Sequence, residues 1–374
     1  MSKPTNELKQ TERLQSLDVL RGFDMLWIAG GGGLIVALAQ TTKWGWLQVI
    51  AEQMEHVVWD GFHFEDLIFP LFMFISGVAI PYAITAKVEQ GVSKKSLLRK
   101  IIKRGLILVF LGLFCNGVFR NGISEARFPS VLGQIGLGYL FAATIVLYTK
   151  SFKTRIAWLI GILSTIAVLQ LLVPVPGYGT GLLDPVGGIN AWLDRLILPG
   201  KLYGKTFDPE GPLCIVSAIT VTLIGSLAGS ILRDGKPASQ RKAVKLAIAG
   251  IALTSVALIL SPVYPIIKAA WTVPFNLLTT GISFLLLSLF YFSIDVKNWT
   301  KGIASYPILF FKVIGMNSIT IYVAMDILNF GQISQFFIGW LAPSLGNWVI
   351  ALGAIVIEWL FLHFLYKKKI FLRV

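Results

Sequence analysis

Charged residues are scarce in this sequence of 374 residues: only 14% are Asp, Glu, Lys or Arg, whereas 55% are hydrophobic. A soluble domain of average composition carries about 25% charged residues. The shortage excludes a soluble globular protein and indicates that lipid covers most of the surface. Cysteine is also scarce, and Cys115 and Cys214 both lie in apolar stretches without a Cys or His nearby. We therefore expect neither a disulfide nor a metal site.

The sequence also lacks a cleavable signal peptide. The polar residues 1–13 precede an apolar run that ends in Gly30–Gly33 without a small-residue cleavage site. We expect the first helix to stay in the membrane. Because no soluble segment or extended linker interrupts the apolar runs, residues 1–374 are expected to form a single transmembrane domain.

Apolar runs long enough to cross a bilayer, about 20 residues each, dominate the chain. They predict an all-α, polytopic integral membrane protein with about ten transmembrane helices. The expected spans are 17–39, 66–86, 102–119, 130–149, 156–174, 212–232, 243–262, 272–293, 308–329 and 346–366.

Basic residues alternate between the connecting segments. The two tails and every second loop hold 25 of the 33 Lys and Arg residues. The positive-inside rule therefore places both termini, including the tail 1–16, in the cytoplasm, and the longer loops 40–65 and 175–211 on the outer face. The net charge of +14 is thus a topology signal, and no nucleic-acid-binding motif accompanies it.

Ionisable residues cluster between the first outer loop and the second span. His56 is the best candidate for proton transfer, because neutral imidazole accepts and returns a proton near neutral pH. Asp66 begins a helix, where its carboxylate suits the helix dipole, and it is placed to orient an imidazole. The alternative is that His56 is an exposed loop histidine and Asp66 only a helix-terminal charge.

The first span carries two further features. Asp18, Arg21 and Asp24 are spaced by three residues, so Arg21 is expected to pair with Asp18 or Asp24, either structurally or to bind an anionic substrate. Gly30–Gly33 favours a helix break or a close backbone approach at the outer end of this span.

Several ordered blocks of the chain resemble the heparan-alpha-glucosaminide N-acetyltransferase family, including its bacterial members, within a wider group of transmembrane acyltransferases. They extend over most of the chain in the order of that family. The blocks are residues 13–22 (RLQSLDVLRG), 56–77 (HVVWDGFHFEDLIFPLFMFISG), 127–136 (RFPSVLGQIG), 208–211 (DPEG) and 315–318 (GMNS).

The resemblance implies an enzyme that takes an acetyl group from cytoplasmic acetyl-CoA and delivers it to an amino sugar or other glycan acceptor on the far side. His56 occupies the position of the family's proposed active-site histidine and is expected to act as base or nucleophile, with Asp66 orienting it. Further polar residues of the blocks are candidates for substrate binding. They are Trp59, Asp60, Arg127, Gln134, Asp208, Glu210, Asn317 and Ser318.

Two departures from the family concern the acceptor. Ile28 and Ala29 stand where members often carry an Asn near the outer end of the first helix. We also expect the chain to be without the additional N-terminal span of the animal enzyme. We therefore expect an acceptor other than the glucosamine end of heparan sulfate.

The phosphates of CoA are expected to meet basic residues before the third span, namely Arg99, Lys100, Lys103 and Arg104, unless these residues serve only as positive-inside anchors. The expected location is the bacterial cytoplasmic membrane, in contact with lipid, and the apolar faces would allow a homodimer. Two alternatives to an enzyme have the same composition. One is a transporter or flippase for a sugar or lipid-linked glycan, and the other is a structural or regulatory membrane protein.

Overall fold

The computed structural model describes residues 14–122, 125–234 and 238–372. Within these ranges the chain is helical, and extended backbone pairs only in isolated bridges, which confirms the all-α prediction. Among the described residues, eight helices are long and apolar enough to cross a membrane, or nine if α14 (Ser305–Met316) and α15 (Ser318–Ile327), bent by 68°, form one span. Most of the expected cytoplasmic tail, residues 1–16, lies outside the described residues.

The expected count of ten spans stays a prediction. The segment 102–119 falls mainly in α6 (Lys94–Cys115), whose first turns carry several Lys and Arg residues, and α6 is not among the helices apolar enough to qualify. The other long helices agree closely with the expected spans. They are α1 (Gln15–Leu26), α4 (Glu65–Ile80), α8 (Val131–Tyr148), α9 (Phe152–Leu172), α11 (Pro212–Arg233), α12 (Gln240–Leu260), α13 (Val273–Tyr291) and α18 (Trp348–Lys367).

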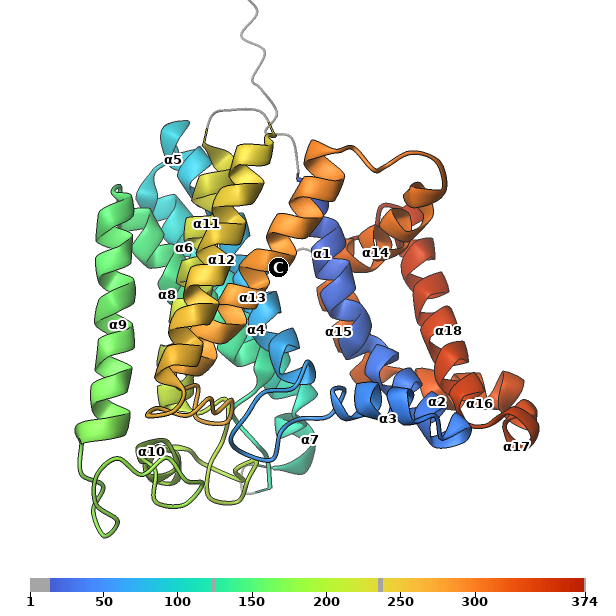
Figure 1. Cartoon of the computed structure of the whole chain (residues 1–374), viewed down its shortest axis with the longest axis horizontal. Helices are drawn as coiled ribbons and strands as arrows, with labels where there is room; N and C mark the ends of the chain where they lie inside the picture. The colour runs from blue at the N-terminus through green and yellow to red at the C-terminus, as the bar shows by residue number, and fades with distance from the viewer. Residues whose placement is uncertain (1–13, 123–124, 235–237, 373–374) are drawn as a thin grey trace, which may run out of the picture.

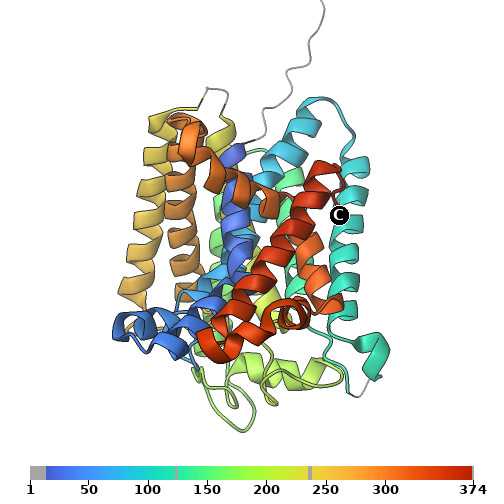
Figure 2. The ribbon, with the colours of Figure 1, turned by 90° about the vertical axis from the view of Figure 1, so that its right-hand side faces the viewer.

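The segments expected on the outer face gather at one end of the bundle, at the bottom of Figures 1 and 2. This end, called the loop end below, contains the loops 40–65 and 175–211. The short helix α5 (Ala86–Glu89) marks the opposite, α5 end. Five short helices also lie at the loop end: α3 (Gly45–Glu52), α7 (Val118–Asn121), α10 (Ile189–Ile197), α16 (Phe330–Ile338) and α17 (Ala342–Leu345).

The centre of the bundle forms where α4 packs against α11. Gly77 and Gly225 face one another there, and a Cβ atom at either position would collide with backbone of the opposite helix. By contrast, α9, α12 and α18 expose many large apolar side chains, including Trp158, Ile259 and Phe364. An apolar outer surface of this extent is stable only in contact with lipid, as expected for a multi-pass membrane protein.

The first span is broken near the loop end, as the glycine run predicts. A π-turn, η1 (Trp27–Gly31), separates α1 from α2 (Gly32–Thr42), and Gly30 has a φ of 104°. A residue with a Cβ atom rarely adopts this conformation. The expected pair of Asp18 and Arg21 is present, with 3.5 Å between Oδ1 and NH1.

Candidate active site

His56, Asp66 and Lys268 meet at the loop end. Nδ1 of His56 lies 3.0 Å from Oδ1 of Asp66 and 3.0 Å from Nζ of Lys268. Nζ of Lys268 also lies 3.3 Å from Oδ1 of Asp66 and 3.3 Å from Nε2 of His56. These three side chains come from the loop before α4, the first turn of α4 and the loop between α12 and α13. Their arrangement brings a base, an orienting carboxylate and a cation together.

Asp66 explains why the loop before α4 folds back over the helix. Its buried carboxylate lies in the first turn of α4, and Oδ2 accepts hydrogen bonds from the backbone N–H groups of His63, at 3.0 Å, and Val57, at 3.4 Å. These bonds fix the loop on both sides of its tip. The imidazole of His56 is held against the other carboxylate oxygen and remains about half exposed, at 51% of the side chain.

A cavity of about 220 Å³ lies between these side chains and the interior of the bundle. His56, Glu65, Glu210 and Lys268 are the ionisable residues of its wall, and Ser318 and Tyr322 add hydroxyl groups from α15. Apolar residues of α1, α4, α8 and α15 form the rest of the wall: Met25, Ile28, Ile68, Phe69, Phe72, Val131, Leu132, Ile135 and Ile319. The cavity is therefore apolar with a few polar groups, as is typical of small-molecule sites.

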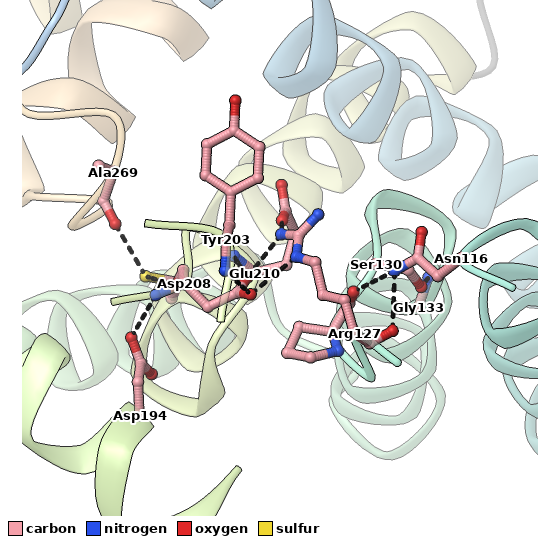
Figure 3. A network of polar contacts seen from close by, with 11 residues as sticks. Asn116, Arg127, Ser130, Gly133, Asp194, Tyr203, Asp208, Glu210 and Ala269 are labelled. Carbon is pink, nitrogen blue, oxygen red and sulfur yellow. Dashed lines mark hydrogen bonds and ion pairs between the residues drawn. The ribbon is translucent and has the colours of Figure 1, made fainter. Parts of the chain in front are cut away.

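A second polar cluster joins this cavity through Glu210. The Arg127 guanidinium forms two hydrogen bonds with Asp208, with Nε to Oδ2 at 2.8 Å and NH2 to Oδ1 at 2.6 Å, and it also pairs with Glu210. Figure 3 shows Arg127 meeting both carboxylates, and its guanidinium lies 4.9 Å from the ring centre of Tyr203. The sequence blocks that contain Arg127, Asp208 and Glu210 thus come together as one unit.

Burial and charge shift the pKa values in this cluster. Burial opposes the charge on Arg127, but hydrogen bonds and attraction from Asp208 and Glu210 outweigh it and raise the pKa of the guanidinium. Burial raises the pKa of Glu210, against the attraction of Arg127. Burial also lowers the pKa of Lys268, with Asp66 opposing that shift. Low-dielectric surroundings therefore act on Arg127, Glu210 and Lys268.

Trp59 braces the loop that carries His56. Its indole Nε1 donates a hydrogen bond of 2.7 Å to the carbonyl of Leu183, and its ring meets Phe207 edge to face at 4.9 Å. Asp60 is exposed and forms a bridge with Ile267, next to Lys268. Neither Trp59 nor Asp60 lines the cavity. Their observed contacts join three loops at the loop end, and the expected role in substrate binding stays a prediction.

The remaining residues expected to bind substrate differ in position. Ser318 lines the cavity, whereas Asn317 occupies the break between α14 and α15 and donates a 3.3 Å hydrogen bond to Val313 within the bundle. Gln134 is fully buried and donates a 3.2 Å hydrogen bond to the carbonyl of Cys214, which joins α8 to α11. Only Ser318 of these three is in contact with the space beside His56.

The residues expected to bind CoA lie far from His56, in the half of α6 nearest the α5 end. Arg99 and Lys103 line an open surface groove, Lys100 is exposed, and the Arg104 guanidinium lies 4.2 Å from the ring centre of Tyr139. At 1.5 Å per residue, about 24 Å of helix separates Arg99 from Cys115 at the other end of α6. The structure does not join these four residues to the cavity, so their role stays a prediction.

Lys268, Glu65 and Tyr322 belong to the cavity wall but are not among the residues expected from sequence. Lys268 is one of few basic residues in the outer loops, and this scarcity was the available signal. Tyr322 follows the polar block of the ninth expected span by one helical turn, which places it on the same face as Ser318. Glu65 adjoins Asp66 in an acidic helix start.

The fold and the site define a multi-pass membrane protein with a histidine–carboxylate pair at the mouth of an apolar cavity. Residues 13–180 match a protein family described as "Domain of unknown function (DUF5009)". The chain is 27% identical to heparan-alpha-glucosaminide N-acetyltransferase of Mus musculus and 27% identical to the human protein of that name. The alignments cover 100% and 97% of this chain, but the chain spans only 62% and 60% of these relatives. The chain is thus a distant relative of proteins with this name, as the ordered sequence blocks indicate.

Proposed function

We propose that this protein is a transmembrane acetyltransferase that moves an acetyl group from acetyl-CoA to an amino sugar or related glycan acceptor. The observation that carries the proposal is the His56–Asp66 pair, with 3.0 Å between Nδ1 and Oδ1, at the mouth of the 220 Å³ cavity. The similarity to two proteins named N-acetyltransferases supports the same reaction class.

In the proposed reaction His56 acts as a general base. With Nδ1–H donated to Asp66, Nε2 carries the lone pair that accepts a proton from the acceptor amine. The amine nitrogen attacks the thioester carbonyl carbon, a C–N bond forms, and the C–S bond breaks. CoA leaves as a thiolate and takes up the proton that His56 received. The products are the N-acetylated acceptor and CoA thiol.

Lys268 is assigned to charge stabilisation in this scheme. The attack places negative charge on the carbonyl oxygen, and a fixed ammonium group in a site of low dielectric stabilises such charge strongly. Lys268 lies 3.3 Å from both Nε2 of His56 and Oδ1 of Asp66, so its cation is held beside the proposed base. The carboxylates of Asp66 and Glu210 keep this cation in place.

The acceptor is assigned to the amine class because of the charges around the cavity mouth. Glu65 and Glu210 lie in the cavity wall, and Glu52 at the end of α3 and Glu55 in the adjacent loop are exposed. Acidic groups attract a protonated amine and raise its local concentration, and the amine releases one proton to solvent before it attacks as the neutral nucleophile. The apolar wall formed by Phe69, Phe72 and their neighbours excludes water, which limits hydrolysis of the thioester.

Release of CoA from acetyl-CoA by purified protein tests the proposal across a panel of amino sugars. His56→Ala is expected to lower acceptor-dependent release by about 10² to 10⁴-fold, the usual contribution of a general base. His363→Phe is the matched control, because His363 lies on α18 outside the cavity and stacks on Trp359, a contact that phenylalanine retains. Sugar movement without CoA release would favour the transporter alternative.

A covalent acetyl-His56 intermediate is the variant of this scheme, since histidine can act as a nucleophile. Single-turnover mixing with labelled acetyl-CoA in the absence of acceptor separates the two routes. Labelled protein together with stoichiometric CoA would establish the covalent route. Absence of both before acceptor is added, followed by CoA release afterwards, would establish direct transfer.

A further inference from the structure

The α5 end of the bundle contains a large basic cavity that is separate from the His56 site. Its volume is about 1100 Å³, and it lies where η2 (Pro81–Thr85), α5, α9, α11 and α12 meet (Figure 1). The two cavities adjoin opposite ends of α11, whose 22 residues extend about 33 Å at 1.5 Å per residue. The acidic residues of the wall are Glu89 and Asp234, and the basic residues are Lys150, Arg155, Arg233, Arg241, Lys242 and Lys245.

Arg155 is the central feature of this cavity. It is buried, with 5% of its surface exposed, and its guanidinium donates hydrogen bonds to Oγ of Ser230, at 3.2 Å, and to the carbonyl of Thr149, at 3.0 Å. Its Nε atom is buried and has no hydrogen-bond partner. In the described part of the chain no carboxylate pairs with Arg155, whereas a buried cation normally requires an anionic partner.

The acidic residues of the cavity wall are too few to neutralise its basic residues. Glu89 is engaged by Arg233 through both carboxylate oxygens, one of them at 3.0 Å. Lys242 donates a 2.7 Å hydrogen bond to the carbonyl of Leu232 at the end of α11. Lys150, Arg241 and Lys245 are exposed at the wall and remain available to a ligand. The cavity therefore has excess positive charge, with a buried guanidinium inside and exposed cations around it.

Two helix N-termini add to the positive electrostatic potential of the cavity. α9 and α12 have 21 residues each and begin beside the cavity, next to Phe152 and Ser239 of its wall. Neither N-terminus has a side-chain cap that accepts a hydrogen bond. Their first turns carry Arg155, Arg241 and Lys242, although basic residues in that position oppose the helix dipole. A bound anion would offset both the dipoles and the side-chain charges.

We propose that this cavity binds a phosphate-bearing anion, with Arg155 as its buried partner and Arg241 and Lys245 as its outer partners. Arginine and lysine beside helix N-termini favour phosphate esters, because phosphate offers several charged oxygens to fixed donors. The volume of 1100 Å³ accommodates more than a single inorganic phosphate. A phospholipid headgroup and a phosphorylated nucleotide share this chemistry, and the experiment separates them.

Binding is measured by thermal shift and titration on the purified full-length protein. The soluble probes are inorganic pyrophosphate and adenosine 3′,5′-bisphosphate, and the lipid probe is a phosphatidylcholine nanodisc with or without phosphatidylglycerol. We expect at least one phosphate-bearing probe to raise the Tm of the wild type. Arg155→Gln and the double variant Arg241→Gln/Lys245→Gln are expected to raise the Kd of that probe at least tenfold.

Lys367→Gln/Lys368→Gln is the control, since it removes two exposed cations from the end of α18 without touching the cavity. If Arg155→Gln fails to fold, the double variant decides, because Arg241 and Lys245 are exposed. Stabilisation by adenosine 3′,5′-bisphosphate beyond that by pyrophosphate identifies a nucleotide-like ligand, equal stabilisation by both identifies a free phosphate group, and stabilisation only by phosphatidylglycerol identifies a lipid headgroup. No stabilisation by any phosphate-bearing probe, or equal stabilisation of all variants, overturns the proposal. Because His56 lies at the other end, His56→Ala is expected to retain binding.

Discussion

Asp66 holds His56 from a position ten residues later in the chain, with 3.0 Å between its Oδ1 and Nδ1 of the imidazole. Its other oxygen accepts the backbone N–H of His63 at 3.0 Å, so the carboxylate fixes both the ring and the loop. Asp66→Asn keeps the size of the side chain but removes the charge that orients the imidazole. We expect kcat to fall about 10² to 10⁴-fold in the folded variant. Glu125→Gln, which neutralises an exposed carboxylate away from the cavity, is the control, and equal activity of the two variants would contradict the assigned role.

Lys268 is expected to set the alkaline limit of activity. Burial lowers its pKa below the ordinary lysine value, so its cation is lost at a lower pH than that of an exposed lysine. If the ammonium stabilises the transition state, kcat declines as pH rises through this lowered pKa. Lys268→Arg keeps a cation at high pH and is expected to shift the decline upward, whereas Lys268→Met is expected to be slow at every pH. Identical alkaline limbs for wild type and Lys268→Arg would exclude this role.

Arg127 is expected to contribute strongly to stability. Arg127→Met leaves the fully buried Asp208 and the largely buried Glu210 without their cation. Breaking a buried ion pair in this way costs about 3–5 kcal/mol. Lys201→Met is the matched control from the same face, because Lys201 and its partner Glu125 are both more than half exposed, and such pairs contribute at most about 1 kcal/mol. Thermal unfolding in detergent measures the difference, and equal losses would refute the assignment.

The buried carboxyl group of Asp194, in the segment 175–211, is expected to make the stability of the protein depend on pH. Burial raises the pKa of Asp194 to about 7, although its Oδ2 accepts the backbone N–H of Asp208 at 2.8 Å. The folded protein therefore retains a proton that the unfolded chain releases near the ordinary aspartate pKa. The contribution of this proton to the free energy of unfolding is complete below the ordinary aspartate pKa. It is lost as pH rises to about 7, by at most about 1.4 kcal/mol per pH unit.

Asp194→Asn removes this titration while an amide oxygen remains to accept the hydrogen bond from Asp208. We expect the Tm of the wild type to decrease more than that of the variant across this pH range. Glu210, whose pKa is also raised by burial, is present in both proteins. The difference between the two Tm profiles therefore reports on Asp194 alone. Parallel Tm profiles would show that Asp194 keeps its ordinary pKa.

The long helices could be predicted from sequence because each requires only a local run of apolar residues. The break at Gly30 was equally local, since only glycine readily adopts the φ of 104° found there. α6 was ambiguous for a physical reason: it combines a charged first half with an apolar second half, so length and hydropathy disagree about where a span begins. The number of spans depends on that helix.

The site was only partly predictable. Asp66 and His56 are close in sequence, and a helix start brings them together. Lys268 is 212 residues from His56, and no local spacing encodes their contact. Gln134 illustrates the opposite limit, because the side-chain NH2 group of a polar residue in an apolar span can donate to a backbone carbonyl instead of a substrate, here that of Cys214. The basic cavity depends on three helix ends that meet only in the folded bundle.

The orientation of the bundle is the remaining prediction, and it follows from the charge distribution. If the positive-inside rule holds, the loop end with His56 faces outward and the α5 end faces the cytoplasm. Val58 is 98% exposed beside His56, and Gln90 is exposed between α5 and α6 at the other end. Single Val58→Cys and Gln90→Cys variants place a thiol on each side.

A membrane-impermeant maleimide applied to intact cells is expected to label Val58→Cys at once and Gln90→Cys only after the membrane is permeabilised. The wild type gives the background, which should be low because Cys214 is buried and Cys115 is partly buried. The reverse pattern would place His56 in the cytoplasm and end the proposal of transfer to an outer acceptor. It would leave CoA release by the purified protein unaffected, because the chemistry at His56 does not depend on orientation.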